Sequence, residues 1–290
     1  MGTTFAAIKF ESWRDLFEFG HGLENWFYRG QSRSEWPLTS SLERAIDVTH
    51  GSSWDWEQTE SWMLRKFRGF AHNYLAHSPA DDDLLEWLAL MQHHGAPTRL
   101  LDCTFSLPVA AFFAARDADT DFAIWAFNWN QFRKSVVGRF QLQIDQEFSV
   151  LDFHAAMHVK ANEFLTRTAH GALAFPTVPR RSNERLEAQQ GMFLFPCDPA
   201  RTLLENLDCL IGQTAMQSIN APANFVPYDV DTRSVGFLRQ HWLLKCVLPK
   251  KEKFNVLREL YRMNIHEASL FPGLDGFARS LRRYTMRDGR

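Results

Sequence analysis

Apolar residues recur at intervals of three and four along much of this 290-residue chain, and that spacing predicts helices with one buried face. The segment 108–115 is apolar nearly all round, which predicts a helix buried on every side. A cluster of aspartates at 81–83 is suited to capping the helix that follows, because the helix dipole favours negative charge there. We expect helices over 11–19, 54–75, 84–91, 108–115, 150–173, 250–263 and 275–283.

Shorter aromatic or alternating runs lie between these segments and predict β-strands. The expected strands cover 26–29, 122–127, 140–144 and 241–248, with a further strand in the apolar half of 185–195. Because helices outnumber strands and the strands are scattered among them, the fold class is α+β, with a central mixed β-sheet split or flanked by helices. We find no internal repeat, so residues 1–290 form one domain with a core at about 20–275 and a basic helix or tail at 276–290.

A compact polar stretch at 92–104 separates the two most apolar helices. Its polar members include His93, His94, Thr98, Arg99, Asp102 and Thr104. Side chains of this kind are rarely buried without partners. The stretch therefore predicts a rigid polar turn that lines a functional site.

Two other segments combine polar side chains with a predicted strand. The first, around Arg29, ends a strand at a sharp turn, and the second, around Gln189, begins one. Arginine binds phosphate groups through fixed, bidentate, charge-assisted hydrogen bonds. A helix that begins near Ser106 would add free backbone N–H groups for an anion. These features favour a pocket for a dinucleotide.

The three segments together resemble the FRG domain family, which is named for an aromatic residue followed by Arg-Gly, here Tyr28-Arg29-Gly30. The segment 90–115 is similar to the central block of that family. The segment 269–276, Ser-Leu-Phe-Pro-Gly-Leu-Asp-Gly, is similar to its closing motif. The resemblance thus covers most of the chain.

The arrangement also resembles that of ADP-ribosyltransferases, which implies an ADP-ribosyltransferase-like fold and NAD as a substrate. In such enzymes an early Arg or His, a Ser, Thr or Tyr before an apolar segment, and a later Glu or Gln share the NAD. The residues that would hold NAD here are Tyr28, Arg29, Gly30, Gln31, Thr98, Arg99 and Thr104. The candidates for the catalytic roles are Gln189, Gln190, Glu187, His93 and Asp102.

The mechanism that this resemblance implies is dissociative: nicotinamide leaves, the ribose becomes oxocarbenium-like, and an acceptor attacks. His93 or Asp102 could deprotonate the acceptor. Gln189 or Gln190 would bind the ribose hydroxyl, although many such enzymes have Glu at that place. Because Gln supplies no carboxylate, either Glu187 takes this role or the acceptor is already nucleophilic, as a nucleobase nitrogen is.

Three classes of function remain open at this point. The favoured one is an NAD-dependent transferase that acts as a toxin or defence effector on a nucleic acid, RNA above all, or on a protein, and that an antitoxin or immunity protein neutralises. The second is a metal-independent nuclease or other hydrolase that uses His93, Arg99 and Asp102. The third is a non-catalytic module that binds a nucleotide or a partner.

Charge and composition narrow these classes further. A net charge of −2 argues against a dedicated nucleic-acid-binding protein, although Arg180, Arg181 and the arginines from Arg279 onward could contact phosphate.

The four cysteines are far apart, so we expect neither a disulfide nor a zinc site. His154 and His158 stand four apart, with His170 beyond, but no third ligand is evident and we expect no metal. No apolar run reaches the roughly twenty residues that cross a bilayer, so a cytoplasmic protein without membrane contact is expected.

Overall fold

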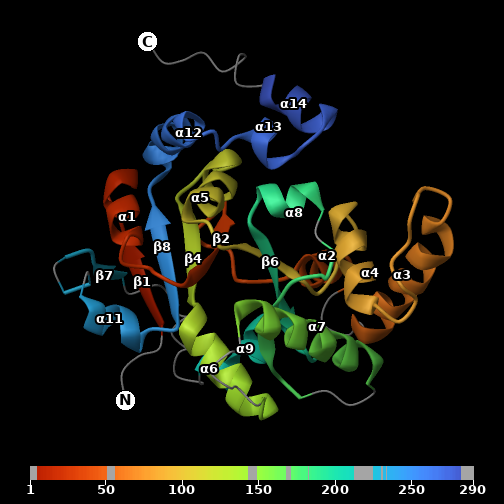
Figure 1. Cartoon of the computed structure of the whole chain (residues 1–290). Coiled ribbons are helices and arrows are strands. Elements are labelled where there is room, and N and C mark those ends of the chain that lie inside the picture. The colour runs from red at the N-terminus through yellow and green to blue at the C-terminus, as the bar shows by residue number, and fades with distance from the viewer. Residues whose placement is uncertain are drawn as a thin grey trace.

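One mixed β-sheet forms the centre of the molecule (Figure 1). The computed structural model describes residues 5–50, 56–142, 149–167, 171–181, 183–211, 225–229, 231–232 and 234–281. Within them the strands are β1 (Phe5–Lys9), β2 (Trp26–Gln31), β3 (Leu101–Thr104), β4 (Phe122–Asn128), β5 (Ala174–Thr177), β6 (Gly191–Pro196), β7 (Phe225–Pro227) and β8 (Leu243–Leu248). Their order is β5-β6-β3-β2-β4-β8-β1-β7, with β1 parallel to β7 and β8. The other paired strands are antiparallel, so the expected central mixed sheet is confirmed.

Helices cover both faces of this sheet (Figure 1). One face carries α1 (Trp13–Gly20), α5 (Leu107–Arg116), α11 (Val235–Gln240), α12 (Lys253–Arg262) and α13 (Glu267–Leu270). The other carries α3 (Trp56–Ala71), α4 (Leu84–His93), α6 (Trp129–Phe140), α7 (Val150–Thr166) and α9 (Leu203–Ile211). The shorter or peripheral helices are α2 (Ser41–His50), α8 (Glu184–Ala188), η2 (Lys250–Glu252) and α14 (Leu274–Ser280).

The two faces hold two separate apolar cores because strand side chains alternate between them. In β4, Phe122 and Ile124 pack into the core under α5, whereas Trp125 and Phe127 pack into the core on the opposite face. All of β4 is buried. A strand buried on both sides cannot show a clear apolar and polar alternation, which explains why its pattern in the sequence is weak.

The helices expected from periodicity are present with shifted ends, and Asp83 caps α4 by accepting a hydrogen bond from the backbone N–H of Glu86 at 3.2 Å. The strand expected at 140–144 is wrong in its described part: Phe140 ends α6, and Gln141 follows in the left-handed conformation at a φ of 50°. Residues 143 and 144 lie outside the described residues. The turn expected at 92–104 contains a strand, β3, because Leu101 and Cys103 face a buried core.

The sheet opens between β2 and β3. These strands share a single bridge, between Tyr28 and Thr104, whereas β2 pairs with β4 at every residue from Trp26 to Gln31. The sharp turn expected at Arg29 is therefore wrong, because β2 continues through Gly30 to Gln31. Beyond the bridge, Arg29 and Gly30 therefore have no backbone partner on the β3 side, and side chains of both strands reach the gap.

Gly30 sets the distance between β2 and α5. A Cβ atom at this position would lie 2.0 Å from the carbonyl oxygen of Ala110 and 2.6 Å from the amide nitrogen of Ala114, both in the backbone of α5. Backbone atoms cannot move aside as the tip of a side chain can. The Arg-Gly pair therefore allows α5 to lie directly on the strand that carries Arg29.

No helix among the described residues has the length and apolarity that a membrane span requires. A cytoplasmic location stays a prediction.

Gly30→Ala is expected to destabilise the protein, because its methyl group must displace α5. Overpacking of this kind costs about 1–3 kcal/mol or more, which chemical denaturation followed by circular dichroism would measure. Gly138→Ala is the matched control: Gly138 lies in α6 with open space around its Cβ position, so Ala should stabilise the helix by roughly 0.5–1 kcal/mol. Equal stability of Gly30→Ala and the wild type would contradict the close approach of α5.

Candidate functional site

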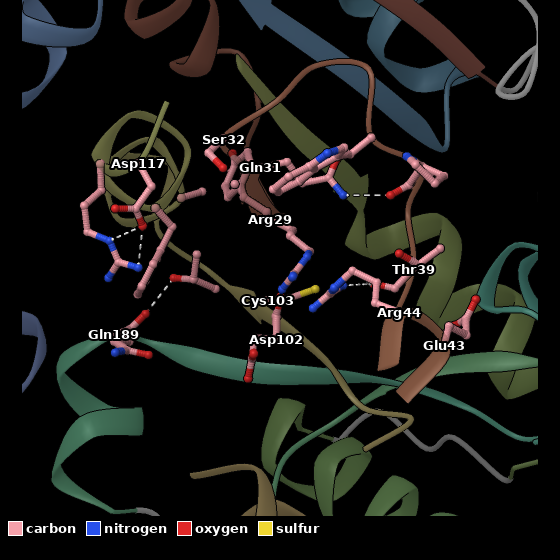
Figure 2. Close-up of a pocket in the computed structure, with 18 of the residues that line it drawn as sticks. Arg29, Gln31, Ser32, Thr39, Glu43, Arg44, Asp102, Cys103, Asp117 and Gln189 are labelled. Carbon is pink, nitrogen blue, oxygen red and sulfur yellow. Dashed lines mark hydrogen bonds and ion pairs between the residues drawn. The ribbon is translucent and has the colours of Figure 1, made fainter. Parts of the chain in front are cut away.

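A cavity of about 780 Å3 lies where β2 and β3 separate (Figure 2). It is lined by Arg29, Gly30 and Gln31 from β2 and by Asp102, Cys103 and Thr104 from β3. Helices α2 and α5 and the segment around α8 complete its walls, with Arg44, Phe113, Arg116, Arg185 and Gln189 among the lining residues. The cavity brings together the three segments that the sequence singled out.

Arg29 bridges the gap in the sheet. Its Nη1 donates a hydrogen bond of 2.7 Å to the backbone carbonyl of Asp102. Its Nε is buried and has no hydrogen-bond partner among the described residues. A buried donor without a partner costs free energy, so the guanidinium retains capacity to bind a further acceptor.

Asp102 is held from the side of α4. Gln92 Nε2 donates to Asp102 Oδ1 at 2.6 Å, and the side-chain carbonyl oxygen of Gln92 accepts a hydrogen bond from the Thr98 hydroxyl. Thr98 is fully buried. Thr98 therefore orients Asp102 through Gln92 and does not itself line the cavity.

Arg44, a residue of α2 that we did not predict from the sequence, lies beside Arg29. Figure 2 shows the two guanidinium groups close together above Asp102. Arg44 Nη1 donates to the carbonyl of Thr39 at 2.7 Å, which fixes the group. Burial lowers the pKa of Arg44, and the positive charge of Arg29 lowers it further. Two adjacent cations of this kind favour an anion between them.

Arg185 brings another positive charge to the cavity from α8. Its guanidinium lies 4.8 Å from the centre of the Phe271 ring. Burial lowers the pKa of Arg185, with a contribution from Arg279 and Arg116, while Asp102 opposes this shift. Arg116 is balanced by Asp117 at 2.8 Å, whereas no carboxylate among the described residues forms an ion pair with Arg185.

Of the three polar residues predicted around 187–190, only Gln189 lines the cavity. Its backbone carbonyl accepts a hydrogen bond from the Thr104 hydroxyl at 2.7 Å, and its Nε2 donates to the carbonyl of Leu270 at 3.0 Å. Gln190 is exposed in a left-handed turn with a φ of 46°, and Glu187 is exposed on α8. The expected strand begins only at Gly191, after this turn.

Tyr28 and Gln31 line the cavity, but their polar atoms are used within the fold. The Tyr28 hydroxyl donates to the carbonyl of Leu23 at 3.2 Å, and burial raises the pKa of Tyr28. Gln31 donates to the carbonyl of Pro37 at 3.0 Å and accepts from the Trp125 indole at 2.7 Å. Both side chains therefore shape the wall of the cavity and offer it little hydrogen-bonding capacity.

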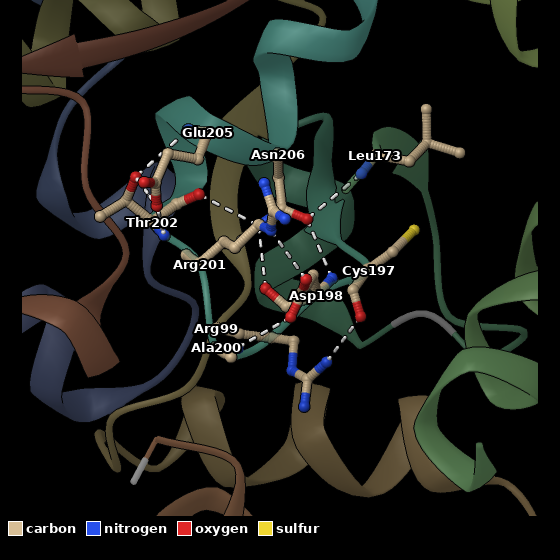
Figure 3. A network of polar contacts seen from close by, with 9 residues as sticks. All are labelled: Arg99, Leu173, Cys197, Asp198, Ala200, Arg201, Thr202, Glu205 and Asn206. Carbon is tan, nitrogen blue, oxygen red and sulfur yellow. Dashed lines mark hydrogen bonds and ion pairs between the residues drawn. The ribbon is translucent and has the colours of Figure 1, made fainter. Parts of the chain in front are cut away.

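Arg99 lies outside the cavity, in a buried ion pair with Glu60 of α3. The Arg99 Nε donates to Glu60 Oε2 at 2.5 Å, and the Arg99 backbone N–H donates to Glu60 Oε1 at 3.0 Å. Arg99 also contacts the carbonyl of Cys197 at 3.4 Å (Figure 3). These contacts join α3, the segment before β3 and the end of β6, so Arg99 is a structural residue.

A second network beside Arg99 fixes the segment that follows β6 (Figure 3). The buried amide of Asn206 accepts from the N–H of Asp198 at 2.9 Å and donates to the carbonyls of Asp198 and Thr202, at 2.9 and 3.0 Å. Thr202 lines the cavity. The network therefore anchors one wall of the site.

His93 is half-buried at the end of α4 and does not line the cavity. Burial, the charge of Arg185 and that of His94 lower its pKa. The hydrolase alternative requires His93, Arg99 and Asp102, and only Asp102 lines the cavity. Arg99 is held away from it by the ion pair with Glu60. The geometry therefore does not assemble that set.

The start of α5 also lies outside the cavity. Ser106 caps the helix by accepting from the backbone N–H of Val109 at 3.3 Å. The cavity is lined instead by residues further along α5, including Phe113 and Arg116. The expected anion site at this helix start is therefore not part of the cavity, and the arginines are its cationic groups.

His158, one of the histidines considered as metal ligands, and the Cys103 thiol have structural roles. His158 Nε2 lies 2.8 Å from Asp83 Oδ2 and its Nδ1 lies 3.3 Å from the carbonyl of Val178, which joins α7 to the start of α4. No group of three metal-ligating side chains occurs among the described residues, and His170 lies outside them. Burial raises the pKa of the Cys103 thiol to about 12, so it is no nucleophile at neutral pH.

Residues 24–122 match the model of the FRG domain family, which supports the FRG family for this part of the chain. No curated protein and no solved structure matches the chain. The matched segment includes Arg29, Arg44 and Asp102 of the cavity. It ends before Gln189 and before the segment 269–276, whose likeness to the closing motif of the family stays a prediction.

Glu60→Ala is expected to destabilise the protein by about 3–5 kcal/mol, because it leaves the buried guanidinium of Arg99 without a carboxylate to balance its charge. Glu18→Ala is the control, since Glu18 pairs with Arg14 on the surface and such pairs contribute about 0–1 kcal/mol. Thermal and denaturant unfolding would measure both. If the Glu60 variant lost less than about 1 kcal/mol, Arg99 would not be the structural residue described.

Proposed function

We propose that this protein is an NAD-dependent ADP-ribosyltransferase whose active site is the cavity between β2 and β3. The observation that carries the proposal is the convergence of Arg29, Arg44, Asp102 and Gln189 on one cavity. A volume of about 780 Å3 is within the range of pockets that enclose small molecules and cofactors.

The diphosphate of NAD would bind between Arg29 and Arg44. Both guanidinium groups are anchored to backbone carbonyls, at 2.7 Å each, so little side-chain freedom is lost on binding. Arg29 Nε has no partner among the described residues and would donate to a phosphate oxygen. The anion would also relieve the repulsion between the two cations.

The aromatic side chains of the wall would contact the rings of the dinucleotide. Trp36 and Trp56 line the cavity, and so does Phe113 of α5. Flat aromatic groups bind nucleobases by stacking. This distribution supports a ligand that carries a ring system beyond the phosphates.

Asp102 and Gln189 would act at the ribose next to nicotinamide. The C1′–N bond to nicotinamide breaks, and its electron pair leaves with nicotinamide, which becomes neutral. The Asp102 carboxylate stabilises the positive charge on the ribose and then takes the proton of the acceptor as the new bond to C1′ forms. Gln189 has its Nε2 bound to Leu270, which leaves its Oε1 to accept from a ribose hydroxyl.

This assignment gives the carboxylate role to Asp102 in place of Glu187. Glu187 is exposed and outside the cavity, whereas Asp102 lines it and is oriented by Gln92. Gln190 and His93 also lie outside the cavity. A role as a toxin or defence effector, with a neutralising partner protein, accords with such a transferase and is part of the proposal.

Arg44→Ala should weaken NAD binding about 10- to 100-fold, because a charge-assisted hydrogen bond contributes about 1.5–3 kcal/mol. Arg29→Ala should have an equal or larger effect. Isothermal titration calorimetry with NAD measures this affinity. Arg262→Ala is the matched control, since Arg262 is exposed on α12 and pairs with Glu259 away from the cavity. Unchanged affinity in both cavity variants would refute the proposed diphosphate site.

Asp102→Asn should retain NAD affinity within a few-fold but lower the rate of nicotinamide release about 10²- to 10⁴-fold, because the amide neither stabilises the cation by charge nor accepts the proton. Release is followed by chromatography with labelled NAD, with and without cellular RNA, DNA or protein as acceptor. Glu187→Gln serves as the comparison and should be close to the wild type. The reverse ranking of the two variants would exclude Asp102 as the catalytic carboxylate.

A further inference from the structure

Three arginines gather around one aromatic ring at the rim of the cavity. The guanidinium carbons of Arg185, Arg279 and Arg116 lie 4.8, 5.5 and 5.8 Å from the centre of the Phe271 ring. Phe271 is 8 % exposed. We call this group, Arg116, Arg185 and Arg279 around Phe271, the arginine rim.

The rim is fixed to the site by interactions between segments distant in sequence. The carbonyl of Leu270 accepts from Gln189 at 3.0 Å. Gly276 of α14 packs so closely on Phe271 that a Cβ atom would lie 1.7 Å from the Phe271 carbonyl oxygen. The ring and its arginines therefore hold a defined position at the edge of the cavity.

Two of the three arginines of the rim form no ion pair among the described residues. Arg116 pairs with Asp117, but neither Arg185 nor Arg279 forms an ion pair with a carboxylate there. The electrostatic effect of Arg279 on the pKa of Arg185 agrees with their proximity. A guanidinium stacked on a ring keeps its N–H edge free for an anion, so both groups can bind an anionic ligand.

The position of the rim relative to Asp102 suggests which ligand this is. Arg29 and Arg44 are one pair of cations near Asp102, and Arg185 interacts with Asp102 from α8. Arg279 lies further outward on the exposed surface of α14, a helix that also carries Phe277, which is 54 % exposed. A polyanionic chain with aromatic bases matches this succession of cations and an exposed ring.

We propose that the arginine rim binds the backbone phosphates of a single-stranded nucleic acid and presents one of its nucleotides to Asp102. This rests on the proposed function, because it names the acceptor that the transferase would modify. An acidic protein segment, which offers carboxylates but no bases, is the competing ligand in the test.

The test is binding of fluorescein-labelled single-stranded RNA and DNA 12-mers, measured by anisotropy at several salt concentrations without NAD. For Arg185→Ala and Arg279→Ala, the negative slope of log K against log salt should become shallower by about 0.7 for each phosphate that the variant no longer binds. Arg262→Ala should keep the wild-type slope. Arg279 is exposed, so its variant tests the proposal even where Arg185→Ala impairs folding, which circular dichroism would reveal.

Three results would overturn the proposal. The first is 12-mer binding by Arg279→Ala that equals that of the wild type, and the second is competition by polyglutamate of equal charge that is as effective as competition by unlabelled 12-mer. The third is a salt dependence that becomes shallower in Arg29→Ala but in neither rim variant. The last would mean that the strand enters the dinucleotide cavity. Calorimetry with NAD on the wild-type protein separates the two proposals. NAD binding without 12-mer binding refutes the rim alone, and 12-mer binding through Arg279 without NAD binding refutes the proposed function alone.

Discussion

The site exists because β2 and β3 part after one backbone bridge, between Tyr28 and Thr104. The cavity lies where the strands separate and is lined by residues of both, Asp102 among them. The hydrogen bond from Arg29 to the carbonyl of Asp102 replaces the missing backbone pairing. It holds the strands at a fixed separation and at the same time carries a positive charge into the opening.

Arg29 and Gly30 perform opposite tasks at this gap. The long side chain of Arg29 spans the space toward β3, whereas the absent side chain of Gly30 lets α5 reach the strand backbone. Because α5 carries Phe113 and Arg116, its position determines one wall of the cavity. Two other side chains of the site are also held by groups from other elements. The Gln92 side chain of α4 donates to Asp102, and the backbone carbonyl of Leu270 in α13 accepts from Gln189.

Much of the site could be predicted from the sequence because its parts are local. Arg29 and Asp102 lie within the short strands β2 and β3, and Gln189 lies in the turn before β6. That pattern of polar residues next to apolar runs is visible in the chain. Arg99 has the same local pattern but pairs with Glu60, thirty-nine residues away in sequence. Partners so distant cannot be inferred from spacing. For the same reason Arg44 was missed, since only the fold brings α2 beside β2.

The fold was predictable where periodicity is clear and not elsewhere. The α+β class and the buried helix expected at 108–115 are confirmed, the helix as α5. Strand β1 is short and rich in alanine, which carries little strand propensity. The strand predicted at 140–144 is wrong. It begins with Phe140, the last residue of α6, and an apolar run of a few residues does not distinguish a strand from the end of a helix.

The most direct test of the account is a crystal structure of the protein with bound NAD. We expect the diphosphate between the guanidinium groups of Arg29 and Arg44, with the ribose C1′ that carries nicotinamide facing Asp102. Electron density for NAD at any other place on the molecule, or a cavity that stays empty at saturating NAD, would contradict it.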